Sequence, residues 1–178
     1  SLHDALPILR DVDLSVVTFR PETELLASLL GSLAEASRTL RLHLLVQDNS
    51  PEPEHLEAIR AMPELAAGAF ASVDVQGSGE NVGFGRGHNA NVRRGRSPWL
   101  LVINQDCIVE PGALERLVET ASADDAKVAA WEMRQIPYEH PKAYDPATLD
   151  APWASGAATL YRREAYEAAG GFDEAIFM

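Results

Sequence analysis

Polar and acidic side chains follow three separate apolar segments of the sequence, and together they could bind a charged ligand. They are Thr18, Phe19 and Arg20 at the end of the first segment, Asp48, Asn49 and Ser50 after the second, and Asn104, Gln105 and Asp106 after the third. A single Asp after a strand is ordinary turn chemistry. Parallel strands, however, bind ligands beyond their carboxyl ends, so three such groups predict one shared site.

Asp106 is the sharpest of these candidates, because the apolar run LLVIN before it holds it at the end of a buried strand. A carboxylate there can hold Mg²⁺ or Mn²⁺ against a diphosphate, since these metals favour oxygen ligands and keep substrate phosphates in their shell. The net charge of −12 means that a phosphate ligand needs such a local cation. The alternative is that Asp106 caps the helix that begins near Pro111.

The segment Asn81–Asn89 (NVGFGRGHN) is the second strong feature. Glycines such as Gly83 let the backbone approach a ligand, and amides at a helix start can meet phosphate. Arg86 adds a local positive charge, and Asn89 lies one turn further on. The alternative is a loop that binds nothing. A dinucleotide-binding fingerprint fits poorly, because the glycines have the wrong spacing and follow the third predicted strand.

The elements that must position these residues alternate between strand and helix. We predict strands at 14–19, 42–47, 71–76, 99–104 and 128–133. We predict four helices: one that begins at Pro21, one at 54–62, one that follows the glycine-rich segment and ends at about Arg94, and one at 111–121. The run at 99–104 is apolar throughout, which is typical of a strand covered on both faces. This alternation predicts a single α/β domain with a mostly parallel sheet flanked by helices.

Composition narrows the possible functions. The acidic net charge of −12 argues against nucleic acid as a ligand. The single cysteine, Cys107, excludes an internal disulfide and suits the cytoplasm. No apolar run reaches the length of a membrane span, so we expect a protein that is at most peripheral at a membrane. Residues 1–10 lack any period and are predicted to be a non-native leader before a domain at 11–178.

The motifs resemble, in order and spacing, family 2 glycosyltransferases and most closely their rhamnosyltransferase-like branch. The matching pieces are SVVTF at 15–19, DNS at 48–50, NVGFGRGHN at 81–89, INQD at 103–106, EPGAL at 110–114, WASGAATLYRREA at 153–165 and GGFDEAIFM at 170–178. The resemblance implies a GT-A (Rossmann-like) fold. It also implies inverting transfer of a sugar, with rhamnose favoured, from a UDP- or dTDP-sugar to a glycan or lipid-linked acceptor.

The resemblance further implies roles for individual residues. Donor-binding positions are Thr18, Phe19 and Arg20 around the nucleobase, Asp48 and Asn49 at base or ribose, and Asn81, Gly83, Arg86, Asn89, Asn104 and Gln105 along the nucleotide and sugar. The family's metal-binding Asp-X-Asp falls on residues 104–106, where the first Asp is Asn, which leaves Asp106 as the main ligand for Mg²⁺ or Mn²⁺. Positions on the acceptor side or at the donor sugar are Trp153, Ser155, Gly156 and Asp173.

The catalytic base of the family is an Asp in a Glu-Asp pair shortly after the GGFDE segment. The resemblance therefore places the base beyond Met178, so we expect no catalytic residue in this chain, which would bind donor without transferring sugar. Two alternatives stay open. One is a non-catalytic nucleotide-sugar-binding pseudoenzyme. The other is a sugar-phosphate nucleotidyltransferase, which should carry a glycine-rich basic loop after the first strand, and residues 18–22 are not one.

Overall fold

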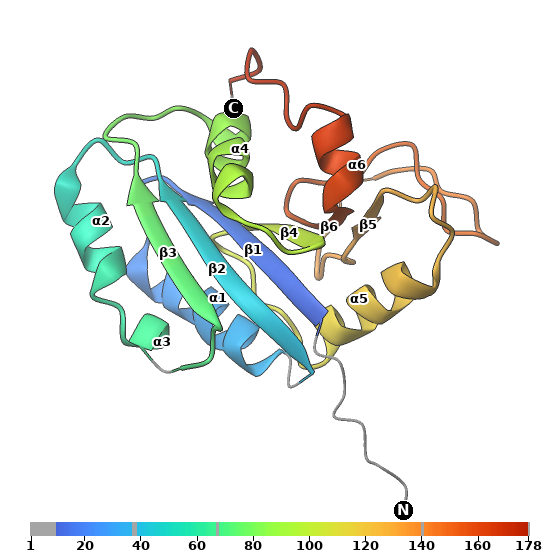
Figure 1. The fold of residues 1–178 in the computed structure, drawn as a ribbon, viewed down its shortest axis with the longest axis horizontal. Helices are drawn as coiled ribbons and strands as arrows, with labels where there is room; N and C mark the ends of the chain where they lie inside the picture. Colours follow the sequence, from blue (N-terminus) through green and yellow to red (C-terminus); the bar gives the residue numbers. More distant parts are fainter. Residues whose placement is uncertain (1–9, 37–38, 67, 140, 178) are drawn as a thin grey trace, which may run out of the picture.

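The computed structural model describes residues 10–36, 39–66, 68–139 and 141–177, which form a six-stranded sheet with helices on both faces (Figure 1). The elements in chain order are β1 (Arg10–Thr18), α1 (Thr23–Glu35), β2 (Leu40–Asp48), α2 (Pro53–Arg60), α3 (Pro63–Ala66), β3 (Ser72–Gly77), α4 (Phe84–Arg94), β4 (Trp99–Asn104), α5 (Ala113–Ala123), β5 (Ala130–Glu132), β6 (Ala158–Arg162) and α6 (Arg163–Ala168). The predicted leader lies outside the described residues except for Arg10, which begins β1.

The sheet has the strand order β3-β2-β1-β4-β6-β5. The first four of these strands are parallel, whereas β6 runs antiparallel to both β4 and β5. The α/β class with a mostly parallel sheet is confirmed. The strand predicted at 128–133 is only Ala130–Glu132, and it pairs with β6, which was not predicted. β6 has five residues and runs directly into α6, so its apolar pattern is too short to reveal a strand.

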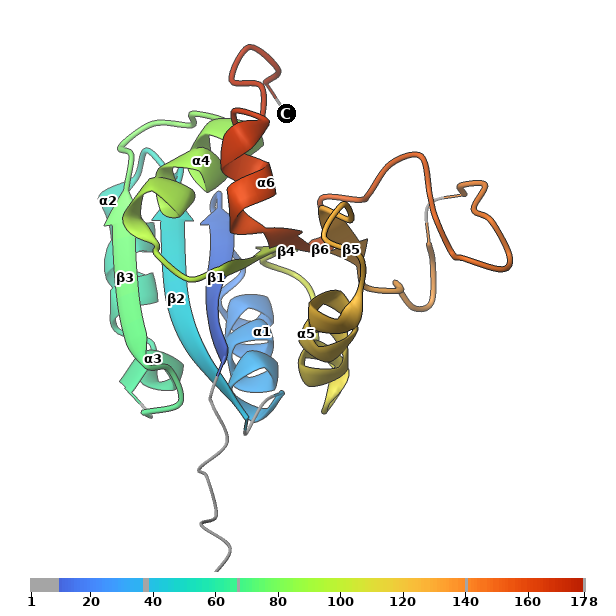
Figure 2. The ribbon, with the colours of Figure 1, turned by 45° about the vertical axis from the view of Figure 1, so that its right-hand side comes forward.

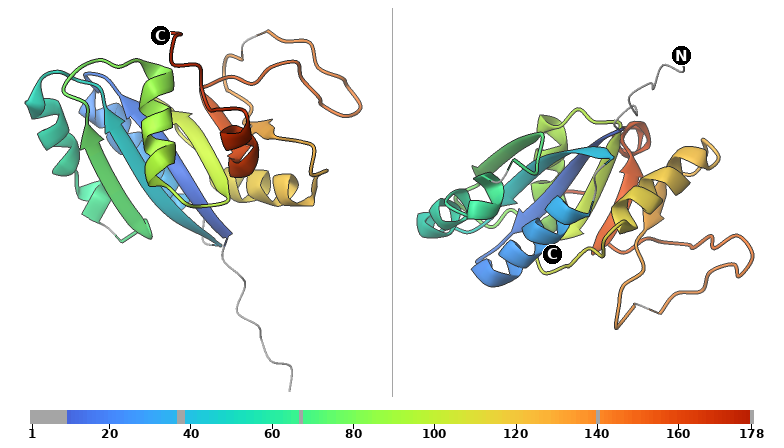
Figure 3. Two further views of the ribbon diagram at one scale, coloured as in Figure 1. Left: turned by 45° about the horizontal axis from the view of Figure 1, so that its top comes forward. Right: turned by 90° about the horizontal axis from the view of Figure 1, so that it is seen from below.

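One face of the sheet is covered by α1 and α5, which lie on the same side (Figure 3). The leucines of α1 recur at spacings of three and four, and they are buried against the central strands; they are Leu26, Leu29, Leu30 and Leu33. From α5, Leu114 and Val118 join the same core. Burial of each such side chain contributes roughly 1.5–3 kcal/mol, so this face supplies most of the hydrophobic stabilisation.

The opposite face is covered by α4 and α6, and its contact with β1 is polar (Figure 1). Arg163, the first residue of α6, pairs with the buried carboxylate of Asp13 in β1. The Ser97 backbone N–H donates to the same carboxylate at 3.1 Å. Arg163 Nη1 also donates to the carbonyl of Val92 at 3.0 Å. The Asp13–Arg163 pair therefore ties α6 and the end of α4 to the central strand.

His88 of α4 is fully buried on this face, and its Nδ1 lies 2.7 Å from Ser15 Oγ. Burial disfavours the charged imidazolium and lowers the pKa of His88 to about 3. In the unfolded chain the imidazole takes up a proton near pH 6.5. The folded state therefore accommodates the neutral form of His88, and protonation of His88 destabilises the folded state relative to the unfolded chain.

We expect His88 to make the domain acid-sensitive. As the pH falls from about 6.5 toward about 3, the unfolded chain binds the proton first, so the free energy of unfolding drops by about 1.4 kcal/mol per pH unit. His88→Gln removes this contribution while its amide can still meet Ser15. Urea unfolding at several pH values between about 7 and about 4.5 measures the slope. Equal slopes for wild type and His88→Gln contradict the assignment.

The connection from β5 to β6 projects from the body of the domain (Figure 2). It is held at its base by Glu132, whose carboxylate pairs with Lys142. The same carboxylate accepts hydrogen bonds from the Ser155 backbone N–H at 2.9 Å and from Gln135 at 3.2 Å.

The helices among the described residues include no candidate for a membrane span, since none combines the required length with sufficient hydropathy.

Candidate functional site

The three groups of polar residues meet at one edge of the sheet, as the sequence predicts. In the strand register Thr18 of β1 lies beside Asp48 of β2, and Val17 lies beside Asn104 of β4. The carboxyl ends of three neighbouring parallel strands thus stand at nearly the same level. This is the edge at which open parallel sheets bind their ligands.

Asp48 is the centre of this edge and is completely buried. Its Oδ1 accepts hydrogen bonds from Thr18 Oγ1 at 2.8 Å and from Ser50 Oγ at 2.7 Å. Its Oδ2 is also buried but has no hydrogen-bond partner among the described residues. An unsatisfied buried carboxylate oxygen is costly. Asp48 is therefore anchored through Oδ1, whereas the hydrogen-bonding capacity of its Oδ2 is unused among the described residues.

Ser50 belongs to this site, although no predicted role falls on it. Its hydroxyl accepts the Arg20 backbone N–H at 2.8 Å in addition to its bond to Asp48. It therefore joins the two turns that follow β1 and β2. Its sequence signal is its place two residues after Asp48, where a side-chain turn is common.

The first turn of α4 lies against the ends of β1 and β2. Asn49 Nδ2 donates to the carbonyl of Gly83, the residue before the helix, at 3.0 Å. Gly87 allows this close approach, because a Cβ there would lie 2.8 Å from a methyl carbon of Val17. Asn81 acts locally by accepting the Gly83 N–H at 3.0 Å. Among the described residues no side chain caps the start of α4, so its first amides can meet an anion.

Phe19 and Arg20 form the rim of the site next to Asp48. Phe19 is 40% exposed, and the guanidinium of Arg20 lies 5.2 Å from the centre of its ring. Arg20 also pairs with Glu52, and this hydrogen-bonded arginine lowers the pKa of the Glu52 carboxyl. The positive charge of Arg20 is thus already matched by a carboxylate of the chain.

The end of β4 supplies the residues of the predicted metal site. The Asn104 backbone N–H donates to the carbonyl of Ala157 at 2.9 Å, which fixes the strand end beside the entry to β6. Gln105 Oε1 is buried without a hydrogen-bond partner among the described residues. Asp106 is exposed. An exposed carboxylate next to an unsatisfied amide oxygen is an oxygen donor set that suits Mg²⁺ or Mn²⁺ with a diphosphate.

The described residues contain no cluster of three or more His, Cys, Asp or Glu side chains that could enclose a metal ion. Mg²⁺ beside nucleotides is usually held by one or two carboxylates together with substrate phosphates and water. A metal at Asp106 would accordingly depend on the nucleotide for its remaining ligands.

Gly156 lies next to the end of β4, because the carbonyl of the following residue, Ala157, accepts the Asn104 N–H. Trp153 and Ser155 precede Gly156 in the same loop. Trp153 is 44% exposed, and Lys142 Nζ lies 4.1 Å from the centre of its ring. Gly156 lies against the ring of Phe84 at the start of α4. Lys142 and its partner Glu132 were not predicted, because they belong to no motif.

Arg86, Asn89 and Asp173 occupy a different place. The side chains of Arg86 and Asn89 form hydrogen bonds with residues between 166 and 174. None of these hydrogen bonds goes to the turn around Asp48. Asp173 is exposed, and its Oδ1 accepts the Ala175 N–H at 2.9 Å. The side chains of Arg86 and Asn89 therefore bond to the C-terminal segment, and this segment lies against the first turn of α4 at Gly85.

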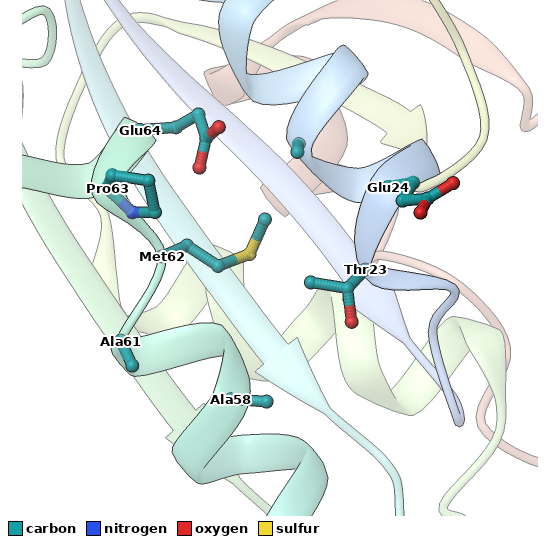
Figure 4. Close-up of a pocket in the computed structure, with 8 residues that line it drawn as sticks. Thr23, Glu24, Ala58, Ala61, Met62, Pro63 and Glu64 are labelled. Atoms are coloured by element: carbon teal, nitrogen blue, oxygen red, sulfur yellow. The ribbon is translucent and has the colours of Figure 1, made fainter.

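A hollow of about 270 Å³ lies between α1, α2 and α3 (Figure 4). Thr23 and Glu24 line it from α1, and Met62 and Glu64 line it from the segment around α3. None of the predicted site residues borders it. It is therefore distinct from the site at the carboxyl ends of the strands.

The sheet order and the antiparallel strand β6 give this α/β domain a GT-A-like fold. A mannosyltransferase of Pyrobaculum calidifontis, PcManGT, solved in complex with GDP-Man and Mn²⁺, has a TM-score of 0.72 at 20% identity, covering 96% of this chain and 50% of its own. Residues 1–349 of S. aureus TarS give a TM-score of 0.63 at 16% identity, covering 94% of this chain and 52% of that chain. The chain thus spans about half the length of these proteins.

The sequence model of the family described as "Glycosyl transferase family 2" matches residues 16–170, and the chain belongs to this family. The match spans the polar edge from Thr18 through Asp106 and extends past β6. No curated protein matches the chain.

Proposed function

We propose that this chain is the nucleotide-sugar-binding domain of an inverting glycosyltransferase. The donor is a UDP- or dTDP-sugar, with rhamnose as the favoured sugar, and the acceptor is a glycan or a lipid-linked glycan met in the cytoplasm. The observation that carries this proposal is the unpartnered, buried Oδ2 of Asp48 among the described residues, on the same sheet edge as the exposed carboxylate of Asp106.

Asp48 is placed to bind the nucleoside part of the donor. Its Oδ2 accepts a hydrogen bond from a ring N–H of the base or from a ribose hydroxyl, while Thr18 and Ser50 hold the other oxygen in place. A hydrogen bond to a charged group contributes about 1.5–3 kcal/mol. Phe19, exposed at the rim, offers a ring face on which the base can stack.

The diphosphate needs positive charge at the end of β4. Arg20 and Arg86 are both paired with carboxylates of the chain, Glu52 and Glu174. This supports a divalent cation held by Asp106, assisted by the neighbouring amides Asn104 and Gln105. When bound, the cation would offset the charge that develops on the departing diphosphate. The Mn²⁺ in the mannosyltransferase complex with GDP-Man supports a divalent cation beside the nucleotide sugar.

Trp153, Ser155 and Gly156 are proposed to border the donor sugar or the acceptor. The Lys142 ammonium beside Trp153 fixes the ring, and Glu132 in turn holds Lys142, so the ring is presented in one orientation. Asp173 is placed on the same side by the proposal. We assign neither Asp173 nor Glu174 as the base that deprotonates the acceptor hydroxyl, because both accept hydrogen bonds from the chain itself.

A pseudoenzyme that binds nucleotide sugar without transfer is the second candidate. The observation that favours it is that Glu174 is engaged by Asn89 and Arg93, which leaves this carboxylate unsuited to accept a proton from an acceptor. Both candidates require the same donor site. They differ only in turnover, so a sugar-transfer assay on a form of the chain that is extended past Met178 separates them.

Asp48→Asn tests the donor site most selectively. The amide oxygen can still accept from Thr18 and Ser50, but an amide nitrogen replaces the unpartnered Oδ2. We expect UDP or dTDP to bind about 10- to 100-fold more weakly, with a Tm without ligand that is equal to or above that of wild type. Titration calorimetry in Mn²⁺ buffer measures this, with Glu57→Gln on the exposed side of α2 as control. Equal affinities of Asp48→Asn and wild type contradict the role.

A further inference from the structure

Asn89 is a buried residue of α4 whose side chain is fully used by the C-terminal segment. Its Nδ2 donates to the carbonyl of Phe172 at 2.9 Å and to Glu174 Oε1 at 3.0 Å. Its Oδ1 accepts from Tyr166 Oη at 2.6 Å and from the Phe172 backbone N–H at 3.0 Å. Two donations and two acceptances are the ordinary capacity of an amide group. Asn89 therefore has little capacity left for a ligand.

Glu174 is held by charge as well as by Asn89. Arg93 Nη1 lies 3.5 Å and Arg86 Nε lies 3.9 Å from its carboxylate oxygens, and Arg86 also donates to its backbone carbonyl at 3.1 Å. The Asn89 hydrogen bond and the Arg93 pair lower the pKa of the Glu174 carboxyl. One face of α4 thus presents an amide and two guanidinium groups to a single carboxylate.

The same segment is shaped for close packing on α4. Gly171 has a left-handed φ of 77°, and a Cβ there would lie 2.6 Å from Asn89 Oδ1. The ring of Phe172 packs edge-on against Phe84 at 5.5 Å between centroids. Because Phe84 also contacts Gly156, the C-terminal segment and the loop before β6 are joined through one ring.

We infer that Asn89, Arg86 and Arg93 are positioning residues that hold the segment 170–176 against α4 and so build the acceptor-side wall of the site. They act on Asp173 and Gly156 through this segment and through Phe84, and they do not bind the nucleotide. The contacts themselves are independent of ligand identity. Only the name of the wall rests on the proposed function.

Asn89→Asp tests this clamp, the set of contacts from Asn89, Arg86 and Arg93 to the segment 170–176. The carboxylate keeps the acceptances from Tyr166 and the Phe172 N–H, but it cannot donate to the Phe172 carbonyl, and it faces Glu174 with like charge. We expect hydrogen exchange at residues 172–176 to accelerate about tenfold. Adding Glu174→Gln should restore exchange to within about threefold of wild type, because the new amide at position 174 can donate to the carboxylate at position 89.

Glu174→Ala is measured in parallel, since it releases the same segment without altering α4 and keeps the test valid if Asn89→Asp does not fold. Exchange in Glu174→Ala within about twofold of wild type, or no recovery in the double variant N89D/E174Q, overturns the inference.

Arg86→Ala tests the statement that the residues of the clamp do not bind the nucleotide. We expect its affinity for UDP with Mn²⁺ to stay within about twofold of Arg96→Ala, a control arginine that donates to nearby backbone carbonyls. A loss as large as that of Asp48→Asn would make Arg86 a phosphate ligand and overturn the inference. If wild type binds no nucleotide at all, the proposed function fails, while the exchange result still decides the clamp.

Discussion

Replacing Asp106 by alanine is expected to abolish metal-dependent binding of UDP or dTDP while leaving the fold intact. Asp106 is an exposed carboxylate just after β4, so its removal opens no cavity. Arg20 and Arg86 are already paired with carboxylates of the chain. Without Asp106 the diphosphate therefore meets an acidic chain of net charge −12 with no held cation. We expect an affinity loss of about 100-fold or more in Mn²⁺ buffer.

Glu110→Ala is the matched control for Asp106→Ala, because it removes an exposed carboxylate from the same loop. We expect its Mn²⁺-dependent affinity to equal that of wild type. Circular dichroism and the Tm establish that Asp106→Ala is folded. Should Asp106→Ala bind nucleotide as well as Glu110→Ala does, Asp106 is not the metal ligand and the metal site must be sought elsewhere; Asp106 does not cap α5 either, because the residue before that helix is Gly112.

Arg163→Met is expected to have the largest effect on stability. It leaves the Asp13 carboxylate, whose side chain is 2% exposed, without its buried countercharge. It also removes the hydrogen bond from Arg163 to the carbonyl of Val92. Breaking a buried pair from one side costs about 3–5 kcal/mol in the free energy of unfolding. Urea unfolding at neutral pH measures the loss.

The double variant Asp13→Asn with Arg163→Met separates charge from packing. With the buried charge gone, we expect it to recover about half of the lost stability. Arg96→Met, on the exposed surface, is the control and should change stability by less than about 0.5 kcal/mol. A loss of under about 1 kcal/mol in Arg163→Met would mean that water or a neighbouring group satisfies Asp13.

The part of the fold that could be predicted is the part encoded by local pattern. The apolar runs of β1, β2 and β4 and the spaced leucines of α1 each identify an element without reference to the rest of the chain. The polar residues that end these strands were found for the same reason. Parallel pairing then brings Thr18, Asp48 and Asn104 to one edge.

The parts that could not be predicted depend on contacts between distant residues. β6 is too short to show a period, and its antiparallel pairing with β4 joins residues that are far apart in the sequence. The pairing of Glu132 with Lys142 and the clamp between Asn89 and Glu174 join side chains that no local motif connects. Asn89 shows this most clearly, because its motif suggested a ligand contact and its hydrogen bonds go to the chain.

The edge defined by Asp48 and Asp106 is proposed to bind a nucleoside diphosphate sugar. Titration calorimetry of the chain with UDP, dTDP and GDP, each with Mn²⁺ and with EDTA, measures this binding. We predict saturable one-to-one binding of UDP or dTDP that requires Mn²⁺ and is weakened in Asp48→Asn and lost in Asp106→Ala. No binding of any of the three nucleotides, or binding that neither substitution weakens, contradicts the proposal.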